Sequence, residues 1–228
     1  QGYLQGNGYV VSWCVGHLIG LVAADAYDAR YSKWCYEDLP IIPEKWKYTV
    51  APDKKDQYEV LVSLINRPDV ESLVCATDAG REGELIFRLV YDHAGCTKPF
   101  ERLWISSMED SAIREGFENL RPGTDYDLLY QAALCRAKAD WLVGISGTRL
   151  FSTLYRKTLN IGRVMTPTLA LVVDRETAIS NFKKEKFYTV VLDCGKFTAA
   201  SKRCENRKAA DNLSAACSTH AAVVQTVE

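Results

Sequence analysis

Three carboxylates and one guanidinium lie close together in the stretch Asp78-Ala-Gly-Arg-Glu-Gly-Glu84. Carboxylates clustered without histidine or cysteine suit a hard cation such as Mg²⁺, which prefers oxygen ligands. A simpler interpretation fits the same residues, because the helix dipole favours glutamate in a first helical turn and aspartate is common in turns. From this stretch alone, a metal site and an ordinary helix start both remain open.

The elements on either side of this stretch predict where its side chains lie. The apolar run Leu73–Ala76 is typical of a buried strand, and a helical periodicity of apolar residues begins after Glu82. In open α/β sheets, ligands collect beyond the carboxyl ends of the strands, which is where Asp78 would lie. Glu82 is in the first helical turn and can point back toward the same place.

Strands and helices alternate over the first half of the chain. The expected elements are a strand at Tyr9–Val15, a helix at Lys54–Ile65, the strand and helix just described, a strand at Phe100–Ile105, and a helix opened by the capping-box residues Ser106 and Ser107 and stopped by Pro122-Gly123. Such alternation predicts a largely parallel sheet with right-handed crossovers. We therefore expect a first α/β domain that ends near Gly123.

The following part of the chain is predicted to be helical. A helix is expected over Tyr126–Ile145, with a less regular basic segment after it that runs to Asn160. A second helix is expected with Thr166 as its N-cap and Pro167 at its first position.

Basic residues gather in this helical part although the whole chain has a net charge of −1. Between Arg136 and Arg163 there are six basic residues and a single acid, Asp140. This asymmetry suits a phosphate-binding surface, and a helix N-terminus that follows Arg163 would add favourable N–H groups. A solvated helix face could have the same composition, so both interpretations stay open.

Beyond Phe187 the pattern changes to strands. We expect strands at Phe187–Leu192 and Lys196–Ala199 around a turn at Gly195, then a helix at Lys208–Cys217 and a strand at Ala222–Val227. Because proteins seldom end on an unpartnered strand, we interpret the chain as a piece of a longer polypeptide.

Composition indicates a globular protein that does not span a membrane. Hydrophobic residues make up 47% of the chain and charged residues 25%, which is ordinary for soluble proteins, and no apolar run approaches the roughly 18–20 residues of a membrane span. The eight cysteines are irregularly spaced, without a Cys-x-x-Cys pair. We therefore expect a reducing, cytoplasmic location.

Several stretches together resemble the type IA DNA topoisomerases, and within them the bacterial and plasmid topoisomerase III-like branch. The matching stretches are Ser12–Leu18, Asp38–Trp46, Asp78–Glu84, Leu134–Gly144, Thr148-Arg149 and Gly162–Leu169. The resemblance implies an α/β Toprim domain, Rossmann-like and with a largely parallel sheet, over residues 1–123 but lacking its first strand. It also implies a helical DNA-gripping segment over 124–182 and the start of a β-rich arch over 183–228.

The resemblance assigns roles to the acidic stretch. Asp78 and Glu82 match the first and third acids of the family's metal-binding triplet, and Arg81 matches an arginine suited to the scissile phosphate. The middle acid is replaced here by Gly80, so Glu84 or a bound water is the expected substitute. The implied catalytic residues are Asp78, Arg81 and Glu82, and the implied Mg²⁺ ligands are Asp78, Glu82 and Glu84.

The resemblance also implies a path for single-stranded DNA. Asp140 would brace an arginine–phosphate contact, and Met165 stands where the family usually has glutamine. The expected DNA-binding residues are Trp34, Arg136, Trp141, Arg149, Arg156, Asn160, Ile161, Gly162, Arg163, Val164 and Met165.

The implied reaction is breakage and rejoining of one DNA strand through a 5′-phosphotyrosine, with Mg²⁺ as cofactor. None of the twelve tyrosines lies in the Tyr-x-x-Pro-Arg-Thr setting of the family's nucleophile, and the Glu-Lys-Pro motif of the first Toprim strand is also missing. We therefore expect that this chain, as a monomer, binds single-stranded DNA but does not cleave it.

The same motifs have two rival interpretations, each with a different function. A Toprim-containing accessory module of a mobile element would hold single strands without cutting them, and a stop codon after Glu228 would favour it over the enzyme. A Toprim primase or nuclease is disfavoured, because those families lack the Gly162-Arg-Val-x-Thr-Pro stretch.

Overall fold

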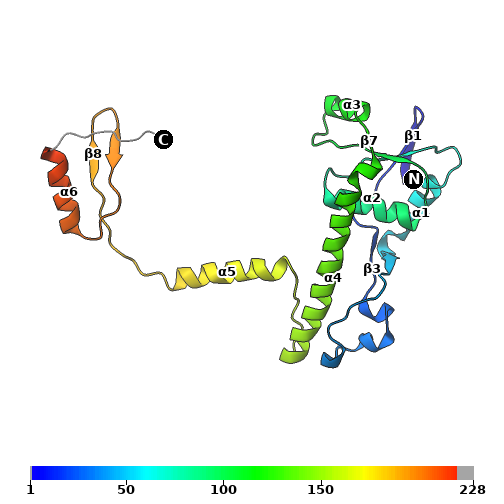
Figure 1. Cartoon of the computed structure of the whole chain (residues 1–228), viewed down its shortest axis with the longest axis horizontal. Helices are drawn as coiled ribbons and strands as arrows, with labels where there is room; N and C mark the ends of the chain where they lie inside the picture. Colours follow the sequence, from blue (N-terminus) through cyan, green and yellow to red (C-terminus); the bar gives the residue numbers. More distant parts are fainter. Residues whose placement is uncertain (1, 220–228) are drawn as a thin grey trace. The chain divides into compact units, whose positions relative to one another are not determined.

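The computed structural model describes residues 2–219, which divide into two compact units after Leu169 (Figure 1). The first unit contains β1 (Tyr3–Gly6), β2 (Tyr9–Ser12), β3 (Ile19–Leu21), β4 (Tyr48–Val50), α1 (Lys55–Ile65), β5 (Leu73–Cys75), α2 (Arg81–His93), β6 (Phe100–Arg102), α3 (Asp110–Glu118), β7 (Arg121–Pro122) and α4 (Asp127–Tyr155). The second contains β8 (Val191–Asp193), β9 (Thr198–Ala200) and α6 (Arg207–Thr219), and α5 (Met165–Ser180) crosses the division.

The strands of the first unit form three small sheets. β5 and β6 pair in parallel, with Leu73 opposite Phe100, and β7 adds to β6 in the antiparallel direction. The pairs β1–β2 and β3–β4 are antiparallel. The expectation of one largely parallel sheet is therefore correct for β5 and β6 and wrong for the strand at Tyr9.

A turn explains why the strand at Tyr9 pairs differently. Asn7 and Gly8 both have positive φ, 49° and 81°, and connect β1 directly to β2. An Asn-Gly pair in this conformation forms the two-residue turn that joins antiparallel strands. The short-range turn signal thus prevails over the alternation of strands and helices.

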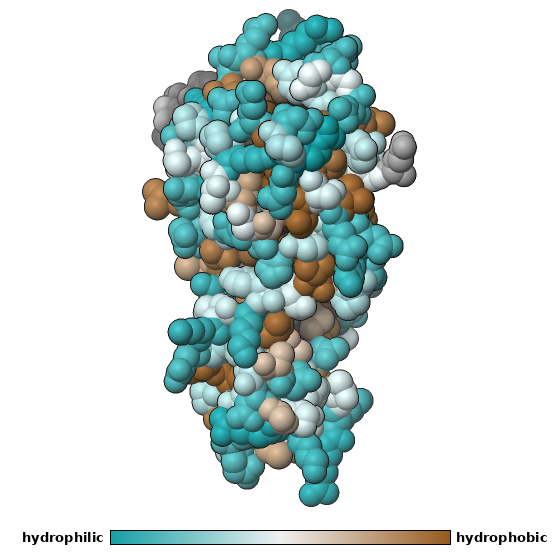
Figure 2. All heavy atoms as spheres, turned by 90° about the vertical axis from the view of Figure 1, so that its right-hand side faces the viewer, coloured by the Kyte–Doolittle hydropathy of each residue, from teal (hydrophilic) through white to brown (hydrophobic). Residues whose placement is uncertain are grey.

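The core of the first unit lies between β3 and the helices α1, α2 and α4. Leu85, Leu89 and Val90 of α2 are buried, as the helical periodicity predicts, and pack with Ile19 of β3 and Ala133 of α4. The face of the molecule in Figure 2 is mainly polar, with apolar side chains in small separate patches. Burial along α2 holds its N-terminal turn, and so the acidic stretch, against the rest of the unit.

Helix starts and ends differ from three expectations. α4 continues ten residues beyond Ile145, as far as Tyr155, where an irregular segment was expected. α5 begins at Met165, so Thr166 and Pro167 lie inside its first turn rather than at its cap. Glu109 is the N-cap of α3 and no side chain caps it; the Ser107 hydroxyl accepts a hydrogen bond from the Glu109 N–H instead.

The second unit agrees with the expected strands and helix. β8 and β9 form an antiparallel pair around Gly195, whose φ of 79° suits a tight turn, and α6 covers the expected helix at Lys208–Cys217. The expected strand at Ala222–Val227 lies outside the described residues, and the division of the chain into three domains remains a prediction. Over residues 2–219, no helix combines the length and apolar character needed to cross a membrane.

Candidate functional site

The loop between β5 and α2 carries Asp78 and folds directly onto the first turn of α2. A Cβ atom at Gly83 would lie 2.1 Å from the Asp78 carbonyl oxygen, so only glycine fits there. The Thr77 hydroxyl donates a 2.8 Å hydrogen bond to the Gly83 carbonyl oxygen. The strand end and the helix start are therefore fixed against each other through the backbone.

We predict that Gly83→Ala destabilises the first unit by about 1–3 kcal/mol or more, the usual effect of an overpacked site. Gly80→Ala is the matched control, because Gly80 has an extended backbone (φ 175°) and no atom lies within 4 Å of the place where its Cβ would be. Urea unfolding followed by tryptophan fluorescence measures both, since all five tryptophans lie between Trp13 and Trp141. Equal midpoints for the two variants would contradict the close approach at Gly83.

Glu82 is surrounded by basic side chains from three different segments. Its carboxylate oxygens lie 3.4 Å from His17 Nε2, 3.8 Å from Arg81 Nε and 3.9 Å from Arg136 Nε. The Glu82 side chain is 54% exposed, so these ion pairs contribute little to stability. They mark the place where α2, α4 and the segment before β3 meet.

A chain of ion pairs continues from Arg136 along α4. Arg136 Nε lies 3.7 Å from Asp140 Oδ2, and Arg163 Nη1 donates a 2.8 Å hydrogen bond to Asp140 Oδ1. The expected arrangement of Arg136 braced by Asp140 is thus present, with Arg163 held to the same carboxylate. The side chains of Arg136 and Arg163 are 38% and 41% exposed, so both are accessible to an anion.

An open cavity of about 380 Å³ adjoins these charges. It is lined by His17, Glu82, Arg136 and Asp140 and by mainly apolar side chains of β3, α2 and α4. The lining therefore combines a few charged groups with a mainly apolar surface, which suits an organic ligand that carries a phosphate.

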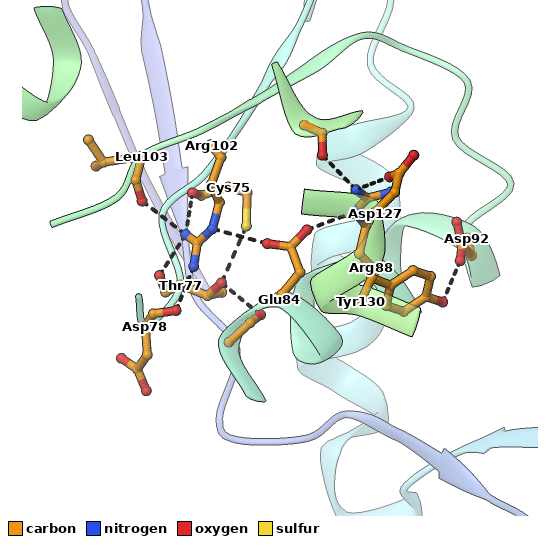
Figure 3. A network of polar contacts seen from close by, with 12 residues as sticks. Cys75, Thr77, Asp78, Glu84, Arg88, Asp92, Arg102, Leu103, Asp127 and Tyr130 are labelled. Atoms are coloured by element: carbon orange, nitrogen blue, oxygen red, sulfur yellow. Dashed lines mark hydrogen bonds and ion pairs between the residues drawn. The ribbon is translucent and has the colours of Figure 1, made fainter. Parts of the chain in front are cut away.

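Glu84 lies elsewhere, and its position corrects the expectation that it binds a metal. Its side chain is fully buried, with Oε1 2.9 Å from Arg88 Nε and Oε2 3.0 Å from Arg102 Nε (Figure 3). The contact with Arg102 is a close ion pair rather than a well-directed hydrogen bond. Both oxygens of the Glu84 carboxylate, which was expected to replace the missing acid at Gly80, are thus already paired with guanidinium groups.

Asp78 and Glu82 are the two acids that stay exposed at the end of β5. Within residues 2–219, no group of three or more histidine, cysteine, aspartate or glutamate side chains is arranged to hold a metal ion. Mg²⁺ is commonly bound by only one or two carboxylates together with water and substrate phosphates. The donor set of Asp78 and Glu82 therefore fits Mg²⁺ when a phosphate is also present.

Arg88 extends the buried network to the start of α4. Its Nη2 donates to Asp127 Oδ1 at 2.6 Å and to the Gly123 carbonyl oxygen at 2.7 Å. Burial lowers the pKa of Arg88, but its hydrogen bonds to Asp127 and Glu84 outweigh this effect and raise that pKa above its ordinary value. Arg88 is therefore a permanent charge that ties α2 to α4.

Trp34 and Arg149 meet toward the other end of α4. Arg149 is only 8% exposed; its Nη1 donates a 2.7 Å hydrogen bond to the Tyr31 carbonyl oxygen, and its guanidinium lies 5.6 Å from the centre of the Trp34 ring. Trp34 itself is 44% exposed. The pair leaves Trp34 available to a ligand, while Arg149 supports it.

Trp141 is used for packing. Its Nε1 donates a 2.8 Å hydrogen bond to the Val22 carbonyl oxygen, and its ring packs edge-on against Tyr27 and Trp46. Trp141 also lines the cavity beside Asp140. Of the two tryptophans expected on the DNA path, Trp34 is therefore the one that is free to stack on a base.

The segment before α5 is bound along the last turns of α4. The Ile161 N–H donates to the Thr148 hydroxyl and the Leu159 N–H donates to the Ser152 hydroxyl, each at 2.9 Å. The other expected contact residues of this segment are exposed or half-buried: Arg156, Asn160, Gly162, Arg163, Val164 and Met165. The hydrogen bonds of Leu159 and Ile161 place this segment beside the last turns of α4.

Two residues of the site were missed from the sequence. His17 lies in a matching stretch, but its position beside Glu82 depends on the packing of β3 against α2. Arg102 ends the short strand β6, directly before the apolar residues Leu103 and Trp104, and a buried charge in such a place needs a partner. That pattern is the signal that could have drawn attention to Arg102.

Comparison with known proteins agrees with the resemblance drawn from the motifs. Residues 124–228 match a family model described as DNA topoisomerase. DNA topoisomerase 3 of Bacillus thuringiensis (strain Al Hakam) is 46% identical over 190 residues, which are 83% of this chain and 26% of that protein. DNA topoisomerase 3 of Staphylococcus epidermidis is 46% identical over 193 residues, 85% of this chain and 27% of that protein.

A solved structure has a similar fold. Full-length topoisomerase I from Thermotoga maritima superimposes with a TM-score of 0.56 at 26% identity, covering 87% of this chain and 32% of that chain. The chain thus spans about a quarter of the length of the curated relatives and a third of the solved one. The resemblance inferred from the sequence is confirmed by all three comparisons.

Proposed function

We infer that this chain is a segment of a type IA DNA topoisomerase of the topoisomerase III kind, and we propose that it holds one DNA strand beside a pair of magnesium-binding acids. The observation that carries the proposal is the connected surface on which Glu82, Arg136, Asp140 and Arg163 are joined by ion pairs next to the Asp78 loop. In the whole enzyme, this surface would take part in breaking and rejoining the strand.

Each side chain has a role in this proposal. Arg136 and Arg163 bind strand phosphates, and Asp140, which contacts both arginines, holds their guanidinium groups in place. Trp34 offers an exposed ring on which a base can stack. Arg81 beside Glu82 adds positive charge where the reacting phosphate would lie, and the His17 imidazole, 3.4 Å from the Glu82 carboxylate, adds a hydrogen-bonding group there.

Asp78 and Glu82 are the proposed ligands of Mg²⁺, which would neutralise charge on the phosphate when bound. The guanidinium groups of Arg81 and Arg136 beside Glu82 oppose the binding of a further cation until a phosphate balances their charge. Mg²⁺ and DNA should therefore bind cooperatively, each increasing the affinity of the other by the same factor.

We predict that Asp78→Asn lowers the affinity for Mg²⁺ at least about tenfold in the presence of a single-stranded oligonucleotide, since one of two carboxylate ligands loses its charge. Binding of the same oligonucleotide without Mg²⁺ should be unchanged. Isothermal titration with Mg²⁺ and fluorescence anisotropy of a labelled 12-nucleotide strand measure the two affinities on the 228-residue chain.

Asp69→Asn is the matched control, because Asp69 is an exposed acid that pairs with Arg67 away from the site. Equal Mg²⁺ affinity in wild type and Asp78→Asn would remove the metal from the proposal. Failure of the wild-type chain to bind the single strand would overturn the proposed function itself. A covalent adduct with DNA would contradict the expectation that these residues do not cleave.

A further inference from the structure

The buried guanidinium of Arg102 is the centre of the loop that carries Asp78. Its side chain has no exposed surface. Nη1 donates to the carbonyl oxygens of Cys75 and Thr77 at 2.8 Å each and of Leu103 at 3.0 Å, and Nη2 donates to the carbonyl oxygen of Asp78. One side chain thus satisfies four backbone acceptors at the carboxyl ends of two neighbouring strands.

Two of these acceptors decide the orientation of Asp78. The Thr77 carbonyl belongs to the peptide unit before the Asp78 Cα atom, and the Asp78 carbonyl belongs to the peptide unit after it. Fixing both planar units fixes φ and ψ of Asp78, and these angles set the direction of its Cα–Cβ bond. Figure 3 shows the two carbonyl groups directed at Arg102 and the Asp78 carboxylate directed away from it.

Glu84 supplies the charge that lets Arg102 remain buried. An unpaired charge in the protein interior is strongly unfavourable, and the Glu84 carboxylate lies 3.0 Å from Arg102 Nε with no exposed surface of its own. Glu84 also pairs with Arg88, which is bonded to the start of α4. The direction of Asp78 is therefore linked, through Arg102, Glu84 and Arg88, to the helix that carries Arg136.

We propose that Arg102 is a positioning residue for the metal site: paired with buried Glu84, it fixes both peptide units around Asp78 and so sets where the Asp78 carboxylate points. This inference rests on the proposed function for the role of Asp78. It assigns Glu84, which follows the metal-binding acids in sequence, to the support of the site instead of to metal binding.

Arg102→Lys tests the proposal. A lysine ammonium keeps the positive charge beside Glu84, but it is a single point with three donors and cannot span both Thr77 and Asp78 carbonyls. Outer contacts that orient a metal ligand typically change metal affinity by about 10–100-fold when removed. We expect Arg102→Lys to weaken Mg²⁺ binding at least about tenfold in the presence of the labelled strand, while strand affinity without Mg²⁺ is unchanged.

Leu64→Ala separates positioning from loss of stability. Leu64 is a buried core residue of α1, so its truncation lowers the thermal midpoint without touching the Asp78 loop, and Mg²⁺ affinity of the folded protein should be unchanged. Hydrogen exchange measured by mass spectrometry gives a second readout that needs no metal. Arg102→Lys should speed exchange in the peptide covering residues 76–83, and Leu64→Ala should not do so selectively.

Wild-type Mg²⁺ affinity in Arg102→Lys, or unchanged exchange in residues 76–83, overturns the positioning role. If the wild-type chain itself binds no Mg²⁺, the metal part of the proposed function fails, and the exchange result alone decides whether Arg102 orders this loop. If Arg102→Lys does not fold, Glu84→Gln replaces it, since it removes the partner charge of Arg102 and keeps the shape. Faster exchange confined to the same peptide supports the proposal, and exchange that is uniform or unchanged overturns it.

Discussion

Glu84→Ala should destabilise the first unit by about 3–5 kcal/mol, the usual consequence of removing one partner from a buried ion pair. The substitution leaves Arg102 in the interior with backbone carbonyl groups as its partners, and Arg88 with Asp127 as its remaining acid. It also opens space between α2 and β6. Urea unfolding followed by tryptophan fluorescence would show a lower midpoint, because every tryptophan of the chain lies before α5.

Glu59→Ala is the matched control for this prediction. Glu59 pairs with Lys55 at the same helical spacing at which Glu84 pairs with Arg88, but its side chain is 62% exposed. Removing it should change stability by less than about 1 kcal/mol. A similarly small effect of Glu84→Ala would show that the buried charges are not what holds α2, β6 and α4 together.

Gly80→Asp should increase the affinity for Mg²⁺ about tenfold or more, because the number and charge of carboxylate ligands tune the affinity of such sites. The position accepts a side chain: its backbone is extended, with φ 175° and ψ 176°, and open space surrounds the place where Cβ would be. Gly80 is also the N-cap of α2, where aspartate is among the preferred residues. The substitution restores the acid that the resemblance to type IA topoisomerases leads us to expect.

Gly80→Asn separates charge from shape in this second experiment. Asparagine caps a helix as well as aspartate does but brings no negative charge to Asp78 and Glu82. Titration calorimetry with Mg²⁺, with and without a single-stranded oligonucleotide, compares the two variants. Identical Mg²⁺ affinities for the two would mean that residue 80 does not face the metal.

The strand-turn-helix unit around Asp78 could be predicted because its evidence is local. β5 covers all but the last residue of the apolar run Leu73–Ala76, and the helical face of Leu85 and Leu89 is the buried face of α2. The buried position of the Glu84 side chain could not be predicted in the same way. Residues two apart on a helix do not face each other, so an exposed Glu82 already indicates that Glu84 points in another direction. Arg88 is a partner at the ordinary helical spacing, but the pairing of Glu84 with Arg102 depends on how β6 packs against α2.

Long-range pairing also explains the other differences. Arg149 is basic and was expected on a DNA path, yet a carbonyl at Tyr31, over a hundred residues earlier, accepts a hydrogen bond from its guanidinium. His17 was not recognised, since its proximity to Glu82 arises from the packing of β3 against α2. Residue type and spacing predicted which side chains have the chemistry to bind DNA or a metal ion. Tertiary contacts decide which of these side chains are exposed and not already paired within the protein.

The length of α4 has a consequence for the DNA that this segment would hold. Because the helix is uninterrupted from Asp127 to Tyr155, it holds Arg136 and the Trp34–Arg149 pair at a fixed separation of about 20 Å, at 1.5 Å per residue. A stacked strand advances roughly 3.4 Å per nucleotide, so about six nucleotides connect the two places. The shortest oligonucleotide that binds with full affinity should then have a length set by α4, whatever its base sequence.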